Sequence, residues 1–330
     1  MPQIDLITGF LGSGKTTFIK DYVKFLTDQG LMVGILENDY GAVNIDMALL
    51  QDLMGENCDV EMIVGGDGVL PHRRRFASKL ITMAMTGYDI VVVEPSGIYD
   101  TDEFFDVLSE DPLCEWYSPG SLIAIVDADL PETLSEESEF LLVSQTACAG
   151  KILLSRWTYE DGSAEGAAKK AGILAHLNRA MERFHCDRRF TEDDLFAKDW
   201  AKMTPEDYAE VGVSGMVPAS FEKMPVEREN GYGTLFYYGT RMEEADLRRK
   251  VAETLSDPAC GNVLRVKGFV RTDENTLMQI NATRRGIEIE PSAFAREVLI
   301  VTGEDLDRTV IDAIWAEASD IITPGTEPAH

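Results

Sequence analysis

Paired cysteines, positive charge and long apolar runs are all scarce in this chain of 330 residues. Its five cysteines are dispersed, and the nearest two, Cys114 and Cys148, stand 34 residues apart. This spacing fits neither a disulfide framework nor a thiolate metal motif, so we expect buried, reduced thiols. No apolar run approaches the ~20 residues that span a bilayer, and strand-like residues begin almost at the N-terminus. We therefore expect a cytoplasmic protein with no membrane span and no signal peptide.

Acidic residues outnumber basic ones by 58 to 30, which gives a net charge of −28. Such a surface repels phosphate backbones and anionic lipids, so we expect neither nucleic acid nor a membrane as a partner. The hydrophobic fraction of 45% is ordinary for a globular protein. The length allows one large domain and a smaller one.

The segment GFLGSGKTT, residues 9–17, matches the phosphate-binding P-loop pattern G-x-x-x-x-G-K-[ST]. A short apolar run precedes it and an amphipathic pattern follows, as the strand–loop–helix context of that motif requires. Glycines let backbone N–H groups converge on an anion at the helix N-terminus. We expect Lys15 to reach the β- and γ-phosphates and Thr16 to ligate Mg²⁺. The predicted ligand is a nucleoside triphosphate, GTP or ATP, contacted by Gly9, Gly12, Ser13, Gly14, Lys15, Thr16 and Thr17.

Continuous Val, Ile and Leu runs alternate with helical patterns along the first half of the chain. Runs of this kind are typical of parallel strands that are buried on both faces. We expect strands over residues 4–7, 31–36, 60–64, 89–93, 122–126 and 151–154, and helices over 18–26, 76–85 and 166–184. These patterns predict an α/β P-loop NTPase domain over residues 1–215, with a mostly parallel sheet covered by helices on both faces.

Residues 216–233 lack periodicity and contain proline and glycine, which is typical of a linker. The pattern then restarts with strands over 235–238, 263–270, 276–282, 286–289 and 298–301. Two helical patterns accompany them over 243–255 and 305–318. Residues 234–330 are therefore expected to form a smaller α+β domain.

Polar side chains follow several of the predicted strands, where open α/β sheets bind their ligands. Glu94 stands where a P-loop enzyme needs an acidic group to organise Mg²⁺ and the attacking water. A strand-end Glu that only caps a helix is the alternative. Gly97 would donate its N–H to the γ-phosphate. Glu37 and Asp39 are candidate metal ligands together with Thr16 and Glu94, although a polar turn at Asn38-Asp39 is an equally good interpretation.

The order of GFLGSGKTT, ENDYG at 37–41, EPSG at 94–97, IVDA at 125–128 and ILLSRW at 152–157 resembles one family. It is similar to the CobW-type P-loop GTPases, relatives of the nickel-insertion GTPases of hydrogenase and urease maturation. VLRVKGFV at 263–270 and VLIVTGEDLD at 298–307 resemble the start and end of that family's C-terminal domain. The resemblance implies slow GTP-driven delivery of a metal or corrinoid to a client protein, and it allows a nucleotide-dependent homodimer.

Two motifs of that family are replaced in this chain. Its C-x-C-C metal-carrier motif should follow the third strand, where residues 66–70 read GDGVL and offer no thiolate. Its guanine-reading N-K-x-D is replaced by Ser155, Arg156, Trp157 and Thr158. Of these, Ser155, Arg156 and Thr158 are the expected base contacts. The aliphatic part of the Arg156 side chain could stack on the base, as the lysine of that motif does. Thr158 cannot accept two N–H bonds as a carboxylate does, so we expect weaker discrimination between GTP and ATP.

The cluster HRRR, residues 72–75, is unusual in so acidic a chain. We interpret it as a solvated helix start, in preference to a contact with phosphate or with an acidic partner. Asp67 and His72 could each bind a metal, but a lone Asp between glycines usually forms a turn.

Three functions remain open from the sequence. An NTPase that loads or activates a metal- or corrinoid-dependent enzyme is favoured by Lys15, Thr16, Glu94 and Gly97. A weakly binding scaffold derived from a GTPase is favoured by the two replaced motifs. A small-molecule kinase is the weakest, since no acceptor-binding pattern is visible.

Overall fold

The computed structural model describes residues 1–39, 50–64, 69–224, 232–273, 276–292, 297–319 and 321–323. Backbone contacts group the described residues up to 224 into one compact unit and those from 232 onward into a second. The domain limits at 215 and 234 stay predictions.

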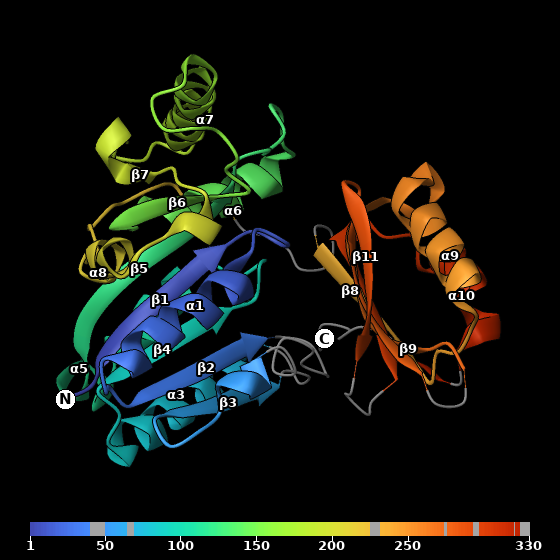
Figure 1. Cartoon of the computed structure of the whole chain (residues 1–330), viewed down its shortest axis with the longest axis horizontal. Coiled ribbons are helices and arrows are strands. Elements are labelled where there is room, and N and C mark those ends of the chain that lie inside the picture. Colours follow the sequence, from blue (N-terminus) through green and yellow to red (C-terminus); the bar gives the residue numbers. More distant parts are fainter. Residues whose placement is uncertain are drawn as a thin grey trace. The chain divides into compact units, whose positions relative to one another are not determined.

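The first unit is built on a parallel sheet of seven described strands in the order β3-β2-β4-β1-β5-β6-β7 (Figure 1). Each neighbouring pair is parallel, and the register places Glu37 of β2 opposite Glu94 of β4. The strands are β1 Gln3–Gly9, β2 Val33–Asp39, β3 Cys58–Val64, β4 Ile90–Pro95, β5 Ser118–Asp127, β6 Lys151–Ser155 and β7 Leu195–Phe196.

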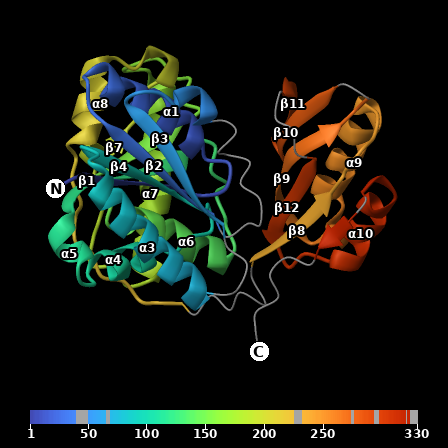
Figure 2. The same ribbon diagram turned by 90° about the horizontal axis from the view of Figure 1, so that it is seen from below.

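Helices cover both faces of this sheet. Figure 2 shows α1 and α8 on one face and α3, α4 and α6 on the other. The helices are α1 Lys15–Asp28, α3 Val69–Thr86, α4 Asp102–Leu108, α5 Leu113–Trp116, α6 Glu136–Ala147, α7 Ala164–Arg183 and α8 Pro205–Gly212. Short 3₁₀ turns lie at η1 Gln51–Leu53, η2 Glu192–Asp194 and η3 Trp200–Lys202. The predicted α/β class is therefore confirmed.

The strands of the first unit contain short apolar runs, such as residues 90–93 in β4. Every residue of β4 is buried, since helices lie on both sides of the sheet. Helices α6 and α8 begin at side-chain caps that stabilise their first turns: Ser135 accepts from the N–H of Ser138 at α6, and Thr204 accepts from the N–H of Asp207 at α8. None of the helices in the described ranges has the length and apolarity that a membrane crossing requires.

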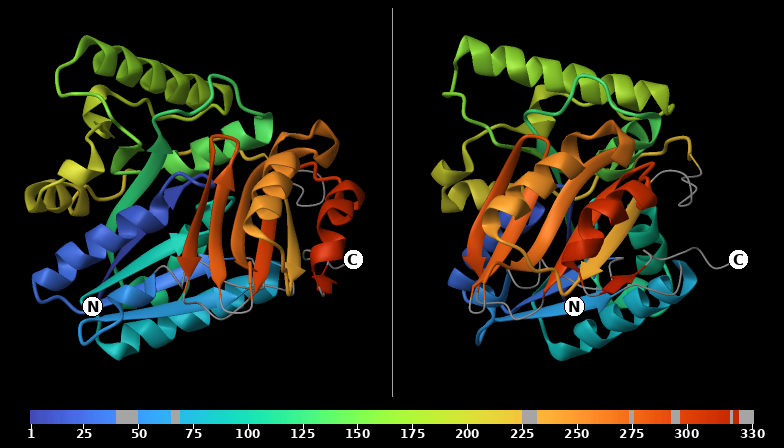
Figure 3. Two further views of the ribbon diagram at one scale, coloured as in Figure 1. Left: turned by 45° about the vertical axis from the view of Figure 1, so that its right-hand side comes forward. Right: turned by 90° about the vertical axis from the view of Figure 1, so that its right-hand side faces the viewer.

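The second unit is an antiparallel sheet with helices, as predicted (Figure 3). Its described strands run in the order β11-β10-β9-β12-β8-β13. Helices α9 and α10 pack on it around Tyr237, Val251 and the fully buried Trp315. The elements are β8 Tyr232–Tyr238, α9 Glu244–Ser256, η4 Pro258–Cys260, β9 Asn262–Arg271, β10 Leu277–Thr283, β11 Gly286–Ser292, β12 Val298–Glu304, α10 Arg308–Trp315, η5 Ala316–Ala318 and β13 Ile321–Thr323.

The described part of the predicted linker, residues 216–224, lies against the first unit and contains no helix. Met216 forms an isolated antiparallel bridge with Ala149. The N–H of Val217 donates to Cys148 O at 3.0 Å, and that of Glu222 donates to Phe184 O at 2.8 Å. These nine residues are thus fastened along the first unit before the chain continues.

Candidate functional site

The loop from Gly9 to Gly14 joins β1 to α1 at the carboxyl edge of the parallel sheet. Gly12 and Gly14 have φ of 71° and 104°, which favour glycine. A Cβ on Gly9 would lie 2.4 Å from the carbonyl oxygen of Ile125, so no larger residue fits there. The first turn of α1 carries no acidic residue although the chain is strongly acidic. The positive end of the helix is therefore left for an anion.

Lys15 is 7% exposed, and its Nζ donates to the carbonyl oxygen of Gly9 at 2.9 Å. The side chain thus folds back over the loop. A buried ammonium that donates to a main-chain oxygen at this place can neutralise the charge of a phosphate chain.

Three of the predicted metal ligands come together beside the loop. Thr16 Oγ1 donates to Glu94 Oε1 at 2.8 Å. Glu37 and Glu94, opposite each other on adjacent strands, are only 2% and 5% exposed. Two buried carboxylates repel each other, and a cation between them relieves that repulsion. Oxygen donors of this kind fit Mg²⁺. The side chain of Asp39, the fourth predicted ligand, lies outside the described part.

The described residues form no group of three or more His, Cys, Asp or Glu side chains that could hold a metal alone. The hydroxyl of Thr16 and the phosphates of a nucleotide would have to complete the coordination shell.

Gly97 lies directly against the phosphate loop. A Cβ at this position would be 2.6 Å from the backbone nitrogen of Leu11, closer than real side chains approach. The loop around it is held from two sides: the N–H of Ser96 donates to Asn38 O at 2.9 Å, and Gln145 Nε2 donates to Gly97 O at 3.0 Å. The predicted γ-phosphate donor is thus next to the loop that would cradle that phosphate.

The segment after β6 approaches the same loop from the opposite side. Arg156 has φ of 55°, donates from Nη2 to Gly12 O at 2.8 Å, and forms an ion pair with Asp127. Ser155 is 2% exposed, and its hydroxyl has no hydrogen-bond partner among the described residues. Thr158 is exposed. Ser155 and Arg156 therefore lie beside the loop, and the guanidinium of Arg156 is already engaged within the protein, while no contact joins Thr158 to the loop among the described residues.

Trp200, at the start of η3, lies against the phosphate loop, and the sequence alone does not predict this contact. Its ring carbon Cζ3 would lie 3.3 Å from a Cβ on Gly14, and its ring is 5.7 Å from that of Phe18. Asp199 caps the turn by accepting from the N–H of Ala201. The one available signal is its place just after β7, at the ligand-binding edge of a parallel sheet.

The position of His72 shows that the interpretation of residues 72–75 as a solvated helix start is wrong for this residue. It is 1% exposed, not solvated, and its Nε2 lies 2.5 Å from Oδ1 of Asn38 in β2. The histidine thus joins α3 to the strand that carries Glu37, because the helix turns this side chain inward. Arg73 pairs with Asp106 and Glu110 at 3.3 and 2.6 Å, while Arg74 and Arg75 are exposed. Asp67 lies outside the described residues.

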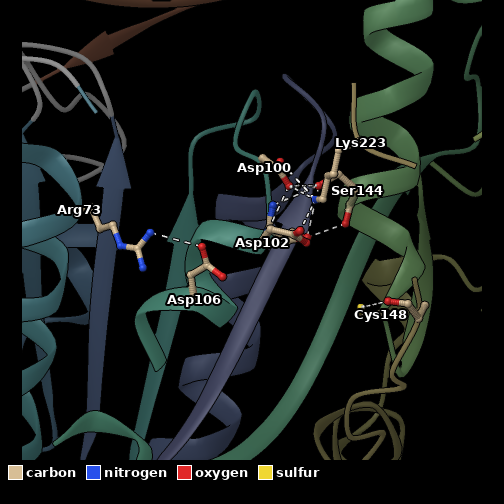
Figure 4. A network of polar contacts seen from close by, with 9 residues as sticks. Arg73, Asp100, Asp102, Asp106, Ser144, Cys148 and Lys223 are labelled. Carbon is tan, nitrogen blue, oxygen red and sulfur yellow. Dashed lines mark hydrogen bonds and ion pairs between the residues drawn. The ribbon is translucent and has the colours of Figure 1, made fainter. Parts of the chain in front are cut away.

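A polar network fastens the loop of Gly97 to α6 and to the end of the first unit (Figure 4). Ser144 Oγ donates to Asp100 Oδ1 at 2.7 Å, and Thr101 Oγ1 donates to the carbonyl oxygen of Ser144 at 2.6 Å. Lys223 lies 3.4 Å from Asp100 and also pairs with Asp102. Figure 4 shows these side chains converging, with Arg73 and Asp106 paired to one side.

Comparison with known proteins assigns the class. The family model described as "CobW/HypB/UreG, nucleotide-binding domain" matches residues 3–182, more than half of the chain. The chain belongs to this family, and the predicted relationship is confirmed.

Two curated relatives are both from Escherichia coli K12. Zinc chaperone YjiA is 26% identical over 183 residues, which are 53% of this chain and 54% of the relative. Zinc chaperone YeiR is 31% identical over 131 residues, 39% of each protein. The chain thus spans about half, or less, of the length of the curated relatives it matches.

Solved structures also resemble the chain. The zinc-bound YjiA GTPase of E. coli has 16% identity and a TM-score of 0.36, and covers 97% of this chain and 100% of its own. The hydrogenase maturation factor HypB of Archaeoglobus fulgidus has 15% identity and a TM-score of 0.40, and covers 63% of this chain and 87% of its own.

Proposed function

We propose that this chain binds a nucleoside triphosphate with Mg²⁺ and hydrolyses it slowly, as an assembly or activation factor for a metal- or corrinoid-dependent client enzyme. The observation that carries the proposal is the convergence of Lys15, Thr16, Glu94 and Glu37 at one edge of the sheet. Family membership and the relatives named zinc chaperones support a role in metal delivery, and thus a client protein, in the cytoplasm.

Each residue has a chemical role in this proposal. Lys15 neutralises the β- and γ-phosphates, and backbone N–H groups of the loop bind their oxygens. Thr16 and the two carboxylates hold Mg²⁺, which when bound spreads the charge of the phosphates. Glu94 also orients the attacking water by accepting its hydrogen bond. Gly97 donates its N–H to the γ-phosphate, so that the loop of residues 96–101 responds to the loss of that phosphate.

GTP is the expected substrate, with relaxed selectivity for the base. Thr158 supplies a single hydroxyl where a carboxylate would take two hydrogen bonds from guanine. Arg156 is paired with Asp127, which limits its use against a base. ATP should therefore compete with GTP.

Phosphate release with Mg²⁺ tests the proposal most directly. Lys15→Ala should reduce turnover roughly 100- to 1,000-fold, because a buried charge aimed at the phosphates is removed. Lys24→Ala is the matched control, since Lys24 is an exposed lysine of the same helix. It should leave turnover unchanged. Equal hydrolysis by folded Lys15→Ala protein would place the reaction elsewhere.

A nucleotide-binding scaffold without useful turnover is the second candidate. It is favoured by the ion pair that engages Arg156 and by the missing carrier cysteines. Binding of nucleotide without Mg²⁺-dependent phosphate release would favour it. Sedimentation with and without nucleotide tests the accompanying proposal of a nucleotide-dependent homodimer.

A further inference from the structure

Trp200 takes no part in the mechanism proposed above, although its ring lies against the phosphate loop. Its ring carbons Cζ3 and Cη2 lie 3.3 and 3.4 Å from the position that a Cβ on Gly14 would take, and Ser155 Cβ lies 3.7 Å from the same position. Trp200 follows β7, and Ser155 ends β6. The two side chains therefore meet at one residue of the loop, directly before Lys15.

The turn that carries Trp200 is held in place on both sides of the ring. Asp199 caps the turn by accepting from the N–H of Ala201 at 3.1 Å. Lys198, the residue before this cap, forms an ion pair with Asp207 in the first turn of α8. Because these contacts fix the backbone around the ring, a ligand that binds to the ring costs the protein little conformational entropy.

One part of the Trp200 ring is packed and another part is open. The ring lies 5.7 Å from that of Phe18, which is buried in α1, at an angle of 58° between the ring planes. Trp200 as a whole is only partly buried, and its indole N–H has no hydrogen-bond partner among the described residues. The buried hydroxyl of Ser155 also has none there. An aromatic ring and two unused hydrogen-bonding groups thus belong to the side chains that meet at the loop.

The predicted contacts of the nucleobase lie at the same place. The phosphates of a nucleotide would occupy the N–H groups at the start of α1, and the base contacts are expected in the segment after β6. The guanidinium of Arg156 in that segment is engaged by Asp127 and by a carbonyl oxygen of the loop. The ring of Trp200, which meets Ser155 beside the loop, is therefore open to a base where this guanidinium is not.

We propose that Trp200 stacks on the nucleobase and thereby gives the chain affinity for purine nucleotides of either kind, an inference that rests on the nucleotide site proposed above. Every base has a π face, so an aromatic ring binds guanine and adenine alike. A neutral ring also adds affinity without adding charge, in a chain whose net charge is −28. The Ser155 hydroxyl can donate or accept, so its contact tolerates both bases as well.

The test compares ligands with and without a base: GDP, ADP and inorganic pyrophosphate, each titrated with Mg²⁺ by calorimetry against the full chain. Trp200→Ala should bind GDP and ADP about 5- to 150-fold more weakly, by similar factors, and pyrophosphate as the native chain does. Trp200→Phe keeps an aromatic face and should retain most of the affinity. The matched control is Trp116→Ala, which removes the other partly buried tryptophan, two residues before β5 at the amino edge of the sheet. It should bind all three ligands as the native chain does.

A spectroscopic measurement accompanies the titrations. Bound GDP should quench tryptophan fluorescence in the native chain and in Trp116→Phe but not in Trp200→Phe, and pyrophosphate should quench it in none of them. An equal loss of pyrophosphate affinity in folded Trp200→Ala would overturn the proposal, because the ring would then only hold Gly14 in place. Unchanged affinity for both nucleotides, or a loss for GDP alone, would overturn it too. A native chain that binds none of the three ligands would refute the nucleotide site itself, and the stacking with it.

Discussion

Replacing Gly97 with alanine is the sharpest test of the contact between the loop after β4 and the phosphate loop. The added methyl would lie 2.6 Å from the nitrogen and 2.8 Å from the Cα of Leu11. Both are backbone atoms, so one of the two loops must shift. Inserting a methyl group into such a contact costs about 1–3 kcal/mol. At 1.4 kcal/mol per tenfold, that is about a 5- to 150-fold loss of triphosphate affinity.

The assay is titration of native and variant protein with a fluorescent triphosphate and the matching diphosphate, together with thermal melting. The loss should be larger for the triphosphate, because the N–H of Gly97 faces the γ-phosphate in the proposed mechanism. Gly172→Ala is the control: this exposed glycine within α7 has no atom within 4 Å of an added Cβ. It should keep full affinity and gain up to about 1 kcal/mol of helix stability. Normal affinity in Gly97→Ala protein would refute the close approach of the two loops.

Three further changes test the other parts of the site. Glu94→Gln should lower turnover at least tenfold more than affinity, since its carboxylate acts mainly in the transition state; equal losses in kinetics and titration would indicate a structural role. Thr158→Asp should raise the ratio of GTP to ATP affinity roughly 10- to 100-fold in competition titrations, and an unchanged ratio would show that another residue contacts the base. Burial raises the pKa of the Asp5 carboxyl, which accepts from Tyr22 Oη and from the N–H of Ser121, both at 2.8 Å. Its contribution to stability is then full below its unfolded pKa of about 4 and is lost as pH rises through the folded pKa. The unfolding free energy of Asp5→Asn, relative to that of the native chain, should therefore be greater at pH 8 than at pH 5 in urea unfolding. The same difference in unfolding free energy at both pH values would contradict this.

Most strands could be predicted because each contains a short apolar run with a clear end, whereas β7 Leu195–Phe196 and β13 Ile321–Thr323 are too short to show such a run. Helix α6 could not be predicted from a periodic pattern of apolar residues. Its residues from Phe140 to Ala147 are all buried, so the helix shows no amphipathic period. Helix α8 has only eight residues, and its main sequence signal is the capping box of Thr204 and Asp207. Periodicity thus finds half-buried helices and misses those that are enclosed or short.

The site divides in a similar way. The roles of Lys15 and Thr16 could be predicted from the sequence motif, because the motif fixes their positions relative to the glycines of the phosphate loop. Contacts that support the phosphate loop come from residues far away in the sequence. Thr8, just before the loop, donates to the carbonyl oxygen of Gln145, 137 residues away, at 2.7 Å. The inward turn of His72 and the approach of Trp200 to Gly14 depend on how whole elements pack. No local pattern encodes such contacts.

The ion pairs of Lys223 have a thermodynamic consequence for the rest of the chain. Asp100 and Asp102, its partners, follow Gly97 within five residues, and Lys223 itself stands just before the residues that lead to β8. Reciprocity applies to any such coupling: if loss of the γ-phosphate weakens the ion pairs, then breaking the ion pairs weakens binding of the triphosphate by the same factor. If that coupling holds, Lys223→Ala should weaken binding of the triphosphate more than binding of the diphosphate.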